Sequence, residues 1–98
     1  MYDLFSVVFV LDRDLRVVFT SETLLRHVPR LGETPVVTEV LELTRPRSLD
    51  TYDDIVARVG SLFLLTALDE SFAMRGQFIH GTENGRDYLV FCGAPWLH

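Results

Sequence analysis

The hydrophobic pattern predicts that both ends of the chain form β-sheet. Five segments rich in apolar, β-branched and aromatic residues have the length of strands. They are residues 5–11, 15–20, 62–68, 73–80 and 87–93. The polar triplet Asp12-Arg13-Asp14 separates the first two segments and predicts a hairpin. Asn84-Gly85 lies between the last two, and this pair favours a tight turn with positive φ.

Three short helices are expected between the second and third of these strands. The expected starts are Ser21, Thr34-Pro35 and Asp50, residue types that cap a helix or begin its first turn. The helices are expected to end at Pro29, at residues 44–47 and at Gly60. The middle helix would bury Val36, Val37, Val40 and Leu41 on one face, and the third would cover residues 51–59. This order predicts an α+β fold in which inserted helices cover one face of an antiparallel sheet.

Both faces of this sheet are predicted to need burial. Val7, Phe9 and Leu11 share one face of the first strand. Val8 and Val10 occupy the other face and are equally apolar. Because the helices can cover only one face, the second is expected to meet a partner chain, a flanking helix or a neighbouring domain. The alternative is that terminal residues of the same chain fold back over it.

Length and charge restrict the class of protein. The 98 residues suffice for one domain, spanning 1–98, and 48% of them are hydrophobic. The formal net charge is −5, and all nine basic residues are arginine, so nucleic acid is not an expected partner. No apolar run approaches the roughly 20 residues of a membrane-spanning helix, so membrane insertion is not expected. The start of the chain lacks a basic signal sequence, which favours a cytoplasmic location.

The sequence contains no pattern typical of catalysis, metal binding or cofactor binding. The three histidines lack ligand spacing, and they are His27, His80 and His98. The acidic pairs fall in turns or at helix starts, and they are Asp12/Asp14, Asp53/Asp54 and Asp69/Glu70. No glycine-rich phosphate loop or serine nucleophile elbow is present. Cys92 is expected to be a small buried apolar side chain. The domain is therefore not expected to be an enzyme.

Several short motifs resemble a known family. Residues 8–19 resemble the opening hairpin of PAS domains, with an apolar strand, an acidic and basic turn, and a second apolar strand. Four motifs in order make nearly the whole chain similar to the haem-NO-binding-associated (HNOBA) domain. They are Leu11-Asp12-Arg13-Asp14, Leu43-Thr44-Arg45-Pro46, Met74-Arg75-Gly76-Gln77 and Phe91-Cys92-Gly93-Ala94-Pro95.

The resemblance implies a PAS-like fold with a five-stranded antiparallel sheet. It also implies a regulatory dimerisation and signal-relay domain that links a haem-NO sensor to a C-terminal output domain, a cyclase or a histidine kinase. The expected partners are a second copy of the chain or a related PAS domain, together with the haem-NO-binding domain or protein. No cofactor is expected in this domain, because haem-binding PAS domains carry a histidine in the helix before the third strand and residues 51–59 have none.

Strand parity, the N-terminal residues and aromatic side chains near the sheet edge define the expected homodimer interface. Its residues are Leu4, Phe5, Val8, Val10, Tyr88, Val90 and Trp96. Arg75 and Gln77 lie in the middle of a strand and are assigned to the interface, to a pocket or to solvent. The alternative function is a small-molecule sensor, whose ligand would lie between sheet and helices in a cavity lined by residues such as Val40, Ile55 and Phe78.

Overall fold

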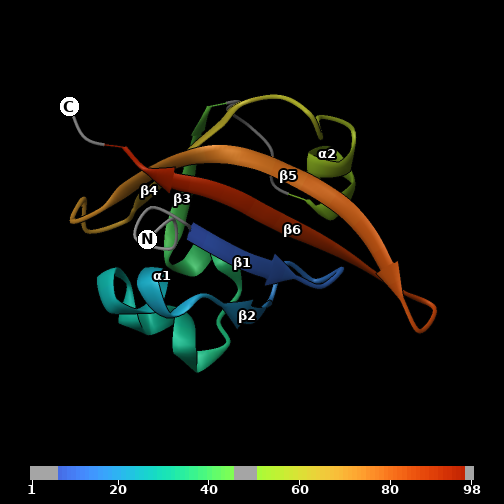
Figure 1. Ribbon diagram of the computed structural model, residues 1–98, viewed down its shortest axis with the longest axis horizontal. Helices are drawn as coiled ribbons and strands as arrows, with labels where there is room; N and C mark the ends of the chain where they lie inside the picture. The colour runs from blue at the N-terminus through green and yellow to red at the C-terminus, as the bar shows by residue number, and fades with distance from the viewer. Residues whose placement is uncertain (1–6, 46–50, 97–98) are drawn as a thin grey trace.

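A computed structural model describes residues 7–45 and 51–96 of the chain, and these residues form a six-stranded antiparallel sheet with short helices (Figure 1). The strands are β1 (Val7–Leu11), β2 (Val17–Thr20), β3 (Leu41–Arg45), β4 (Phe63–Ala67), β5 (Ala73–Glu83) and β6 (Arg86–Pro95). The helices are α1 (Glu22–His27), α2 (Tyr52–Val56) and the 3-10 helices η2 (Pro29–Glu33) and η3 (Val37–Glu39). The strand order is β2-β1-β6-β5-β4-β3, so the two terminal halves of the chain meet where β1 pairs with β6.

The sixth strand, β3, corrects the prediction of five strands and of a regular helix after Thr34. Only the 3-10 helix η3 forms there, and the chain then becomes extended at Leu41. Leu41 is almost fully buried and pairs with Ala67 of β4. The segment Leu-Glu-Leu-Thr-Arg alternates between apolar and polar residues, which is the period of a strand. Pairing with β4 therefore overrides the helical spacing of the preceding valines.

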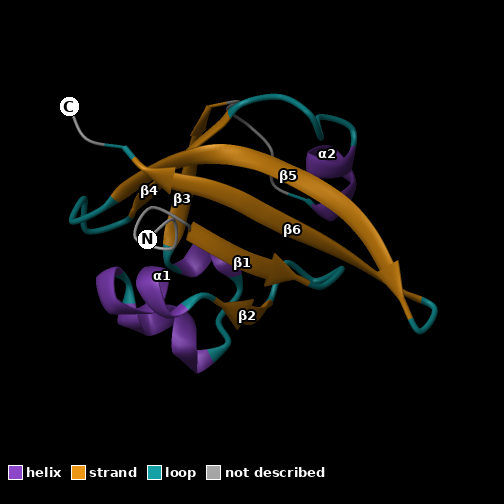
Figure 2. Ribbon diagram, viewed as in Figure 1, coloured by secondary structure: helices purple, strands orange, loops and turns teal. Residues whose placement is uncertain are grey.

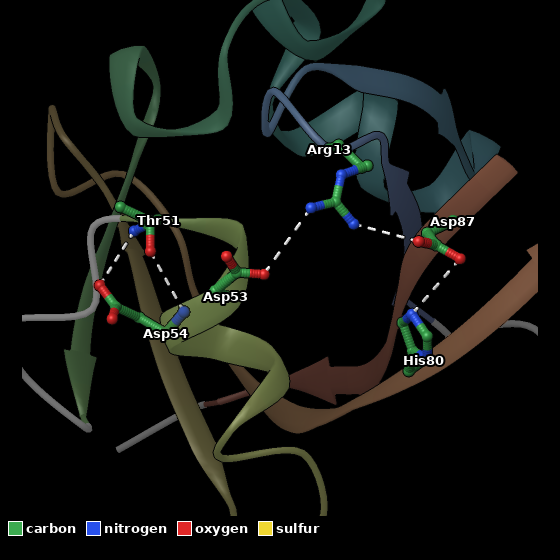
Figure 3. Close-up of polar contacts among 6 residues, drawn as sticks. All are labelled: Arg13, Thr51, Asp53, Asp54, His80 and Asp87. Atoms are coloured by element: carbon green, nitrogen blue, oxygen red, sulfur yellow. Dashed lines mark hydrogen bonds and ion pairs between the residues drawn. The ribbon is translucent and has the colours of Figure 1, made fainter.

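Local capping explains where the two α-helices begin. The Ser21 side chain accepts a hydrogen bond from the backbone of Leu24 at the start of α1, as the sequence predicts. Thr51, and not Asp50, caps α2, and Asp50 lies outside the described residues. The Thr51 hydroxyl accepts from the Asp54 backbone at 3.1 Å, while the Asp54 carboxylate accepts from the Thr51 backbone at 3.2 Å. This reciprocal capping box is drawn in Figure 3. The α-helix ends at Val56, which is earlier than expected.

The hydrophobic core lies on one face of the sheet, beneath the helices. Figure 2 shows α1 close to β1 and α2 beside β5. Four phenylalanines form the centre of this core, with ring centroids 4.8 to 5.9 Å apart. They are Phe9, Phe63, Phe78 and Phe91. Leu24 of α1 and Ile55 of α2 are fully buried in the same cluster, so the helices close this face.

Two opposed glycines bring β5 and β6 close together. Gly76 is paired with Gly93, and both lie in motifs that carry the resemblance to the HNOBA domain. A β-carbon at Gly76 would overlap the carbonyl oxygen of Cys92 and lie 2.5 Å from the Cα of Gly93. A β-carbon at Gly93 would overlap the carbonyl oxygen of Arg75. The two motifs therefore supply the hydrogen side chains that this backbone approach requires.

Candidate interaction face

The face of the sheet opposite the core carries several exposed apolar side chains. Alternation along β1 buries Val7, Phe9 and Leu11 completely, while Val8 and Val10 remain partly exposed. The same alternation along β6 leaves Tyr88 and Val90 partly exposed. These four predicted interface residues therefore share the outer face, at the centre and one end of the sheet.

The strand register aligns four apolar side chains in one row across the outer face. Val10 of β1 is paired with Phe19 of β2 on one side and with Val90 of β6 on the other. Val90 is paired in turn with Ile79 of β5. Phe19 and Ile79 are each 55% exposed. Side chains directly opposite on antiparallel strands are in contact distance, so the row forms one connected strip, which we call the outer row.

Phe19 and Ile79 are interface candidates that the sequence analysis did not identify. Ile79 could have been found from the alternation of β5, since it shares a face with Arg75 and Gln77. Phe19 could not, because the β1–β2 register shifts between Val10 and Leu11. A shift of this kind places an extra residue in one strand and changes which side chains share a face.

Cys92 lies next to the outer row and is exposed. The prediction of a buried cysteine was wrong, because Cys92 alternates with the buried Phe91 and so lies on the outer face. It is paired with Val8 of β1 and with Gln77 of β5. Its thiol is free of any disulfide. A reagent that modifies thiols can therefore report on the middle of this face.

The two polar candidates also lie on the outer face and not in the core. Arg75 and Gln77 are both exposed. The Gln77 side-chain amide donates to the carbonyl of Gly60 at 3.4 Å, which links β5 to the segment after α2. Trp96 is partly exposed at the end of the sheet, where its backbone N–H donates to Ala73. The remaining candidates, Leu4 and Phe5, lie outside the described residues.

A polar cluster at the opposite end of the sheet connects four elements (Figure 3). Arg13, in the β1–β2 turn, forms an ion pair with Asp87 of β6 at 3.0 Å and approaches Asp53 of α2 at 3.9 Å. His80 of β5 approaches Asp87 from the other side at 3.9 Å. All of these side chains are substantially exposed to solvent, so each pair contributes little to stability. The cluster links α2 to the hairpin only weakly, and it contains no nucleophile paired with a base.

Tyr52 lies beneath this cluster with a buried hydroxyl. The Arg13 guanidinium stacks over its ring, 5.0 Å from the centroid. The hydroxyl has no hydrogen-bond partner among the described residues. Burial raises the pKa of Tyr52, and the nearby Asp87 raises it further. Tyr52 is therefore neutral, and no hydrogen bond among the described residues compensates for the desolvation of its hydroxyl.

The described residues do not combine into a metal site, and no helix among them is long and apolar enough to cross a membrane. His27 stacks on Phe72 with the ring centroids 4.5 Å apart, and His98 lies outside the described residues. Val40, Ile55 and Phe78, expected to line a ligand cavity, are buried in the hydrophobic core. The structure instead describes a groove of about 340 Å³ between the α1–η2 region and the β4–β5 turn, of which Val40 forms part.

Comparison with known structures defines the fold class. The chain is similar to the crystallised PAS domain of a Desulfitobacterium hafniense protein, with a TM-score of 0.63 and 7% sequence identity. The alignment covers 93% of this chain and 92% of that domain, so the fold is PAS-like. The family model described as "Heme NO binding associated" (HNOBA) matches residues 1–87. The chain belongs to this family, whose domains are non-catalytic associates of haem-NO sensors. No match is found among curated proteins.

Proposed function

We propose that this domain is a regulatory dimerisation module that relays a signal from a haem-NO sensor to an output domain. The observation that carries the proposal is the outer row, in which Phe19, Val10, Val90 and Ile79 cross four strands on the face opposite the described helices. Isolated exposed apolar side chains are ordinary in monomers, but a connected strip on a sheet face is typical of an interface. Family membership supports a haem-NO sensor as the upstream partner in this proposal.

A second copy of the chain is the partner that fits this face. Two such sheets can pack face to face about a twofold axis, as in a β-sandwich, so that each protomer presents the same strip. Phe19 and Ile79 are about half exposed, and burying them would contribute roughly 1 kcal/mol each per protomer. Since both protomers contribute, this is a gross gain of about 4 kcal/mol before the cost of association. Val8, Val10 and Val90 must therefore be buried too, and the isolated domain should dimerise weakly.

Signal relay follows from two arrangements of one interface. A sensor that binds one arrangement more tightly than the other shifts the population, and the output domain responds to that shift. An apolar strip with few fixed polar contacts permits small rotations of one sheet on the other. The twofold axis transmits such a rotation equally to both protomers.

The proposal is tested by the solution mass of the domain over a dilution series, measured by light scattering after size exclusion. We expect concentration-dependent dimerisation that Ile79→Arg and Val10→Arg weaken at least tenfold, because a charge would be buried in the strip. Leu68→Arg is the matched control, since Leu68 is 52% exposed but lies in the turn after β4, on the groove. A mass that stays monomeric at all concentrations, or that Leu68→Arg lowers as much as Ile79→Arg, contradicts the proposal.

Cys92 provides a second measurement without any substitution. Its exposed thiol lies between Val8 and Gln77 on the same face, so pairing should cover it. The rate at which a maleimide reacts with Cys92 should fall as protein concentration rises, and Ile79→Arg should abolish that dependence. A rate constant independent of concentration in a protein that does dimerise would place the interface elsewhere.

A further inference from the structure

The groove between α1–η2 and the β4–β5 turn has an apolar floor and charges of opposite sign on its two sides. Val28, Val40 and Ala67 line it and are nearly buried. Arg30 comes from η2 on one side, and Asp69 comes from the turn on the other. The volume of about 340 Å³ is at the small end of the range for small-molecule sites, which is roughly 300 to 1,000 Å³.

Hydrogen bonds to Ser71 fix the position of Asp69, one of the two charged side chains. Asp69 accepts hydrogen bonds from the Ser71 hydroxyl at 2.5 Å and from the Ser71 backbone at 2.9 Å. These bonds lower the pKa of Asp69, with a smaller contribution from the Arg30 charge, so the carboxylate stays ionised at neutral pH. Arg30 and Asp69 attract each other without forming a direct ion pair within 4 Å. A small ligand that carries one positive and one negative charge can therefore pair with Asp69 and Arg30 at the same time.

We propose that this groove binds a free α-amino acid with an apolar side chain. The ligand carboxylate would pair with Arg30, since a guanidinium binds a carboxylate through two parallel hydrogen bonds. The ligand ammonium group would pair with Asp69, and the side chain would lie against Val28, Val40 and Ala67. Because both charges of the site are exposed, the affinity should be in the millimolar range. The site is on the helical side of the sheet, so it does not depend on the proposed dimer interface.

The experiment titrates L-leucine and L-phenylalanine into the ¹⁵N-labelled domain and follows backbone amide shifts. We expect saturable shifts confined to residues 27–30 and 67–71, with both Arg30→Gln and Asp69→Asn weakening binding about tenfold. Arg26→Gln is the control, because Arg26 is paired with Glu22 on the neighbouring helix and does not line the groove. Its affinity for leucine should equal that of the wild type.

Two analogues of leucine separate the contributions of the two charges. N-acetyl-leucine lacks the ammonium group and leucinamide lacks the carboxylate, so each should bind about tenfold more weakly than leucine. Asp69→Asn should leave the weak binding of N-acetyl-leucine unchanged, and Arg30→Gln should leave that of leucinamide unchanged. The proposal is overturned if neither amino acid shifts these residues at about 10 mM, where a millimolar site would be largely occupied. It is also overturned if N-acetyl-leucine binds as tightly as leucine. Dimerisation is measured separately by mass, so failure here leaves the proposed function standing.

Discussion

Replacing Gly76 by alanine tests whether the close approach of β5 and β6 determines the stability of this sheet. The added β-carbon would overlap the Cys92 carbonyl oxygen and lie 2.5 Å from the Gly93 Cα, whereas ordinary contacts begin at about 3.4 Å. The obstacle is backbone in both cases, so no side-chain rotation can relieve it. The two strands would have to separate locally by about 1 Å.

The cost can be worked from this displacement. Forcing an extra methyl group into a packed site costs about 1–3 kcal/mol. Each backbone hydrogen bond lost where Gly76 pairs with Gly93 adds about 1 kcal/mol. With two such bonds lost, the sum is roughly 3–5 kcal/mol, a large share of the 5–15 kcal/mol that stabilises a typical domain. For a chain of this length it corresponds to a decrease in Tm of at least about 12 °C.

Gly81→Ala is the matched control in the same strand. A β-carbon at Gly81 would meet nothing within 4 Å, and its φ is not positive. This variant should be neutral or more stable by up to about 1 kcal/mol, since alanine restricts the unfolded chain. Urea unfolding followed by far-UV circular dichroism gives both values. The reasoning is refuted if the free energies of unfolding of Gly76→Ala and Gly81→Ala agree within about 0.5 kcal/mol. A Gly76→Ala protein that is too unstable to purify, while Gly81→Ala is well folded, agrees with the reasoning.

Three further predictions concern single side chains. Tyr52→Phe should unfold at the same or higher urea concentration than the wild type, because it removes a buried hydroxyl without a described partner. The pKa of Tyr52 is raised in the folded state, so its contribution to the free energy of unfolding is complete below the ordinary tyrosine pKa and is lost as pH rises through the folded-state pKa. Tyr52→Phe should not show this loss of stability at alkaline pH. Parallel curves of stability against pH for the two proteins would contradict the prediction. Thr51→Ala should destabilise the domain by about 1 kcal/mol through loss of the α2 capping box, and an unchanged urea midpoint would show that α2 does not need the cap. The pKa of Asp69 is lowered in the folded state, so its contribution to the free energy of unfolding is present above the ordinary aspartate pKa and is lost as pH falls through the folded-state pKa. The free energies of unfolding of wild type and Asp69→Asn, measured with urea, should therefore differ at neutral pH and converge in acid.

Local patterns were enough to predict most of the sheet and its inner face. The hairpin β1–β2, helix α1 and strands β4 to β6 occur where apolar runs, caps and the Asn84-Gly85 turn place them. These features depend on contacts between near neighbours in the chain, and the sequence records such contacts directly. The prediction that Val8 and Val10 lie opposite the core also follows from alternation alone.

Only the tertiary structure decided the features that depend on which strands are neighbours. Leu41–Arg45 became a strand because β4 offered an edge with which to pair, although the preceding valines have helical spacing. The outer row exists because the register of three strand pairs aligns Phe19, Val10, Val90 and Ile79 across sequence separations that no local pattern spans. Arg30 and Asp69 line the same groove for the same reason, since packing brings η2 and the β4–β5 turn together. Local sequence thus determined five of the strands, while long-range pairing determined the sixth and decided which side chains share a surface.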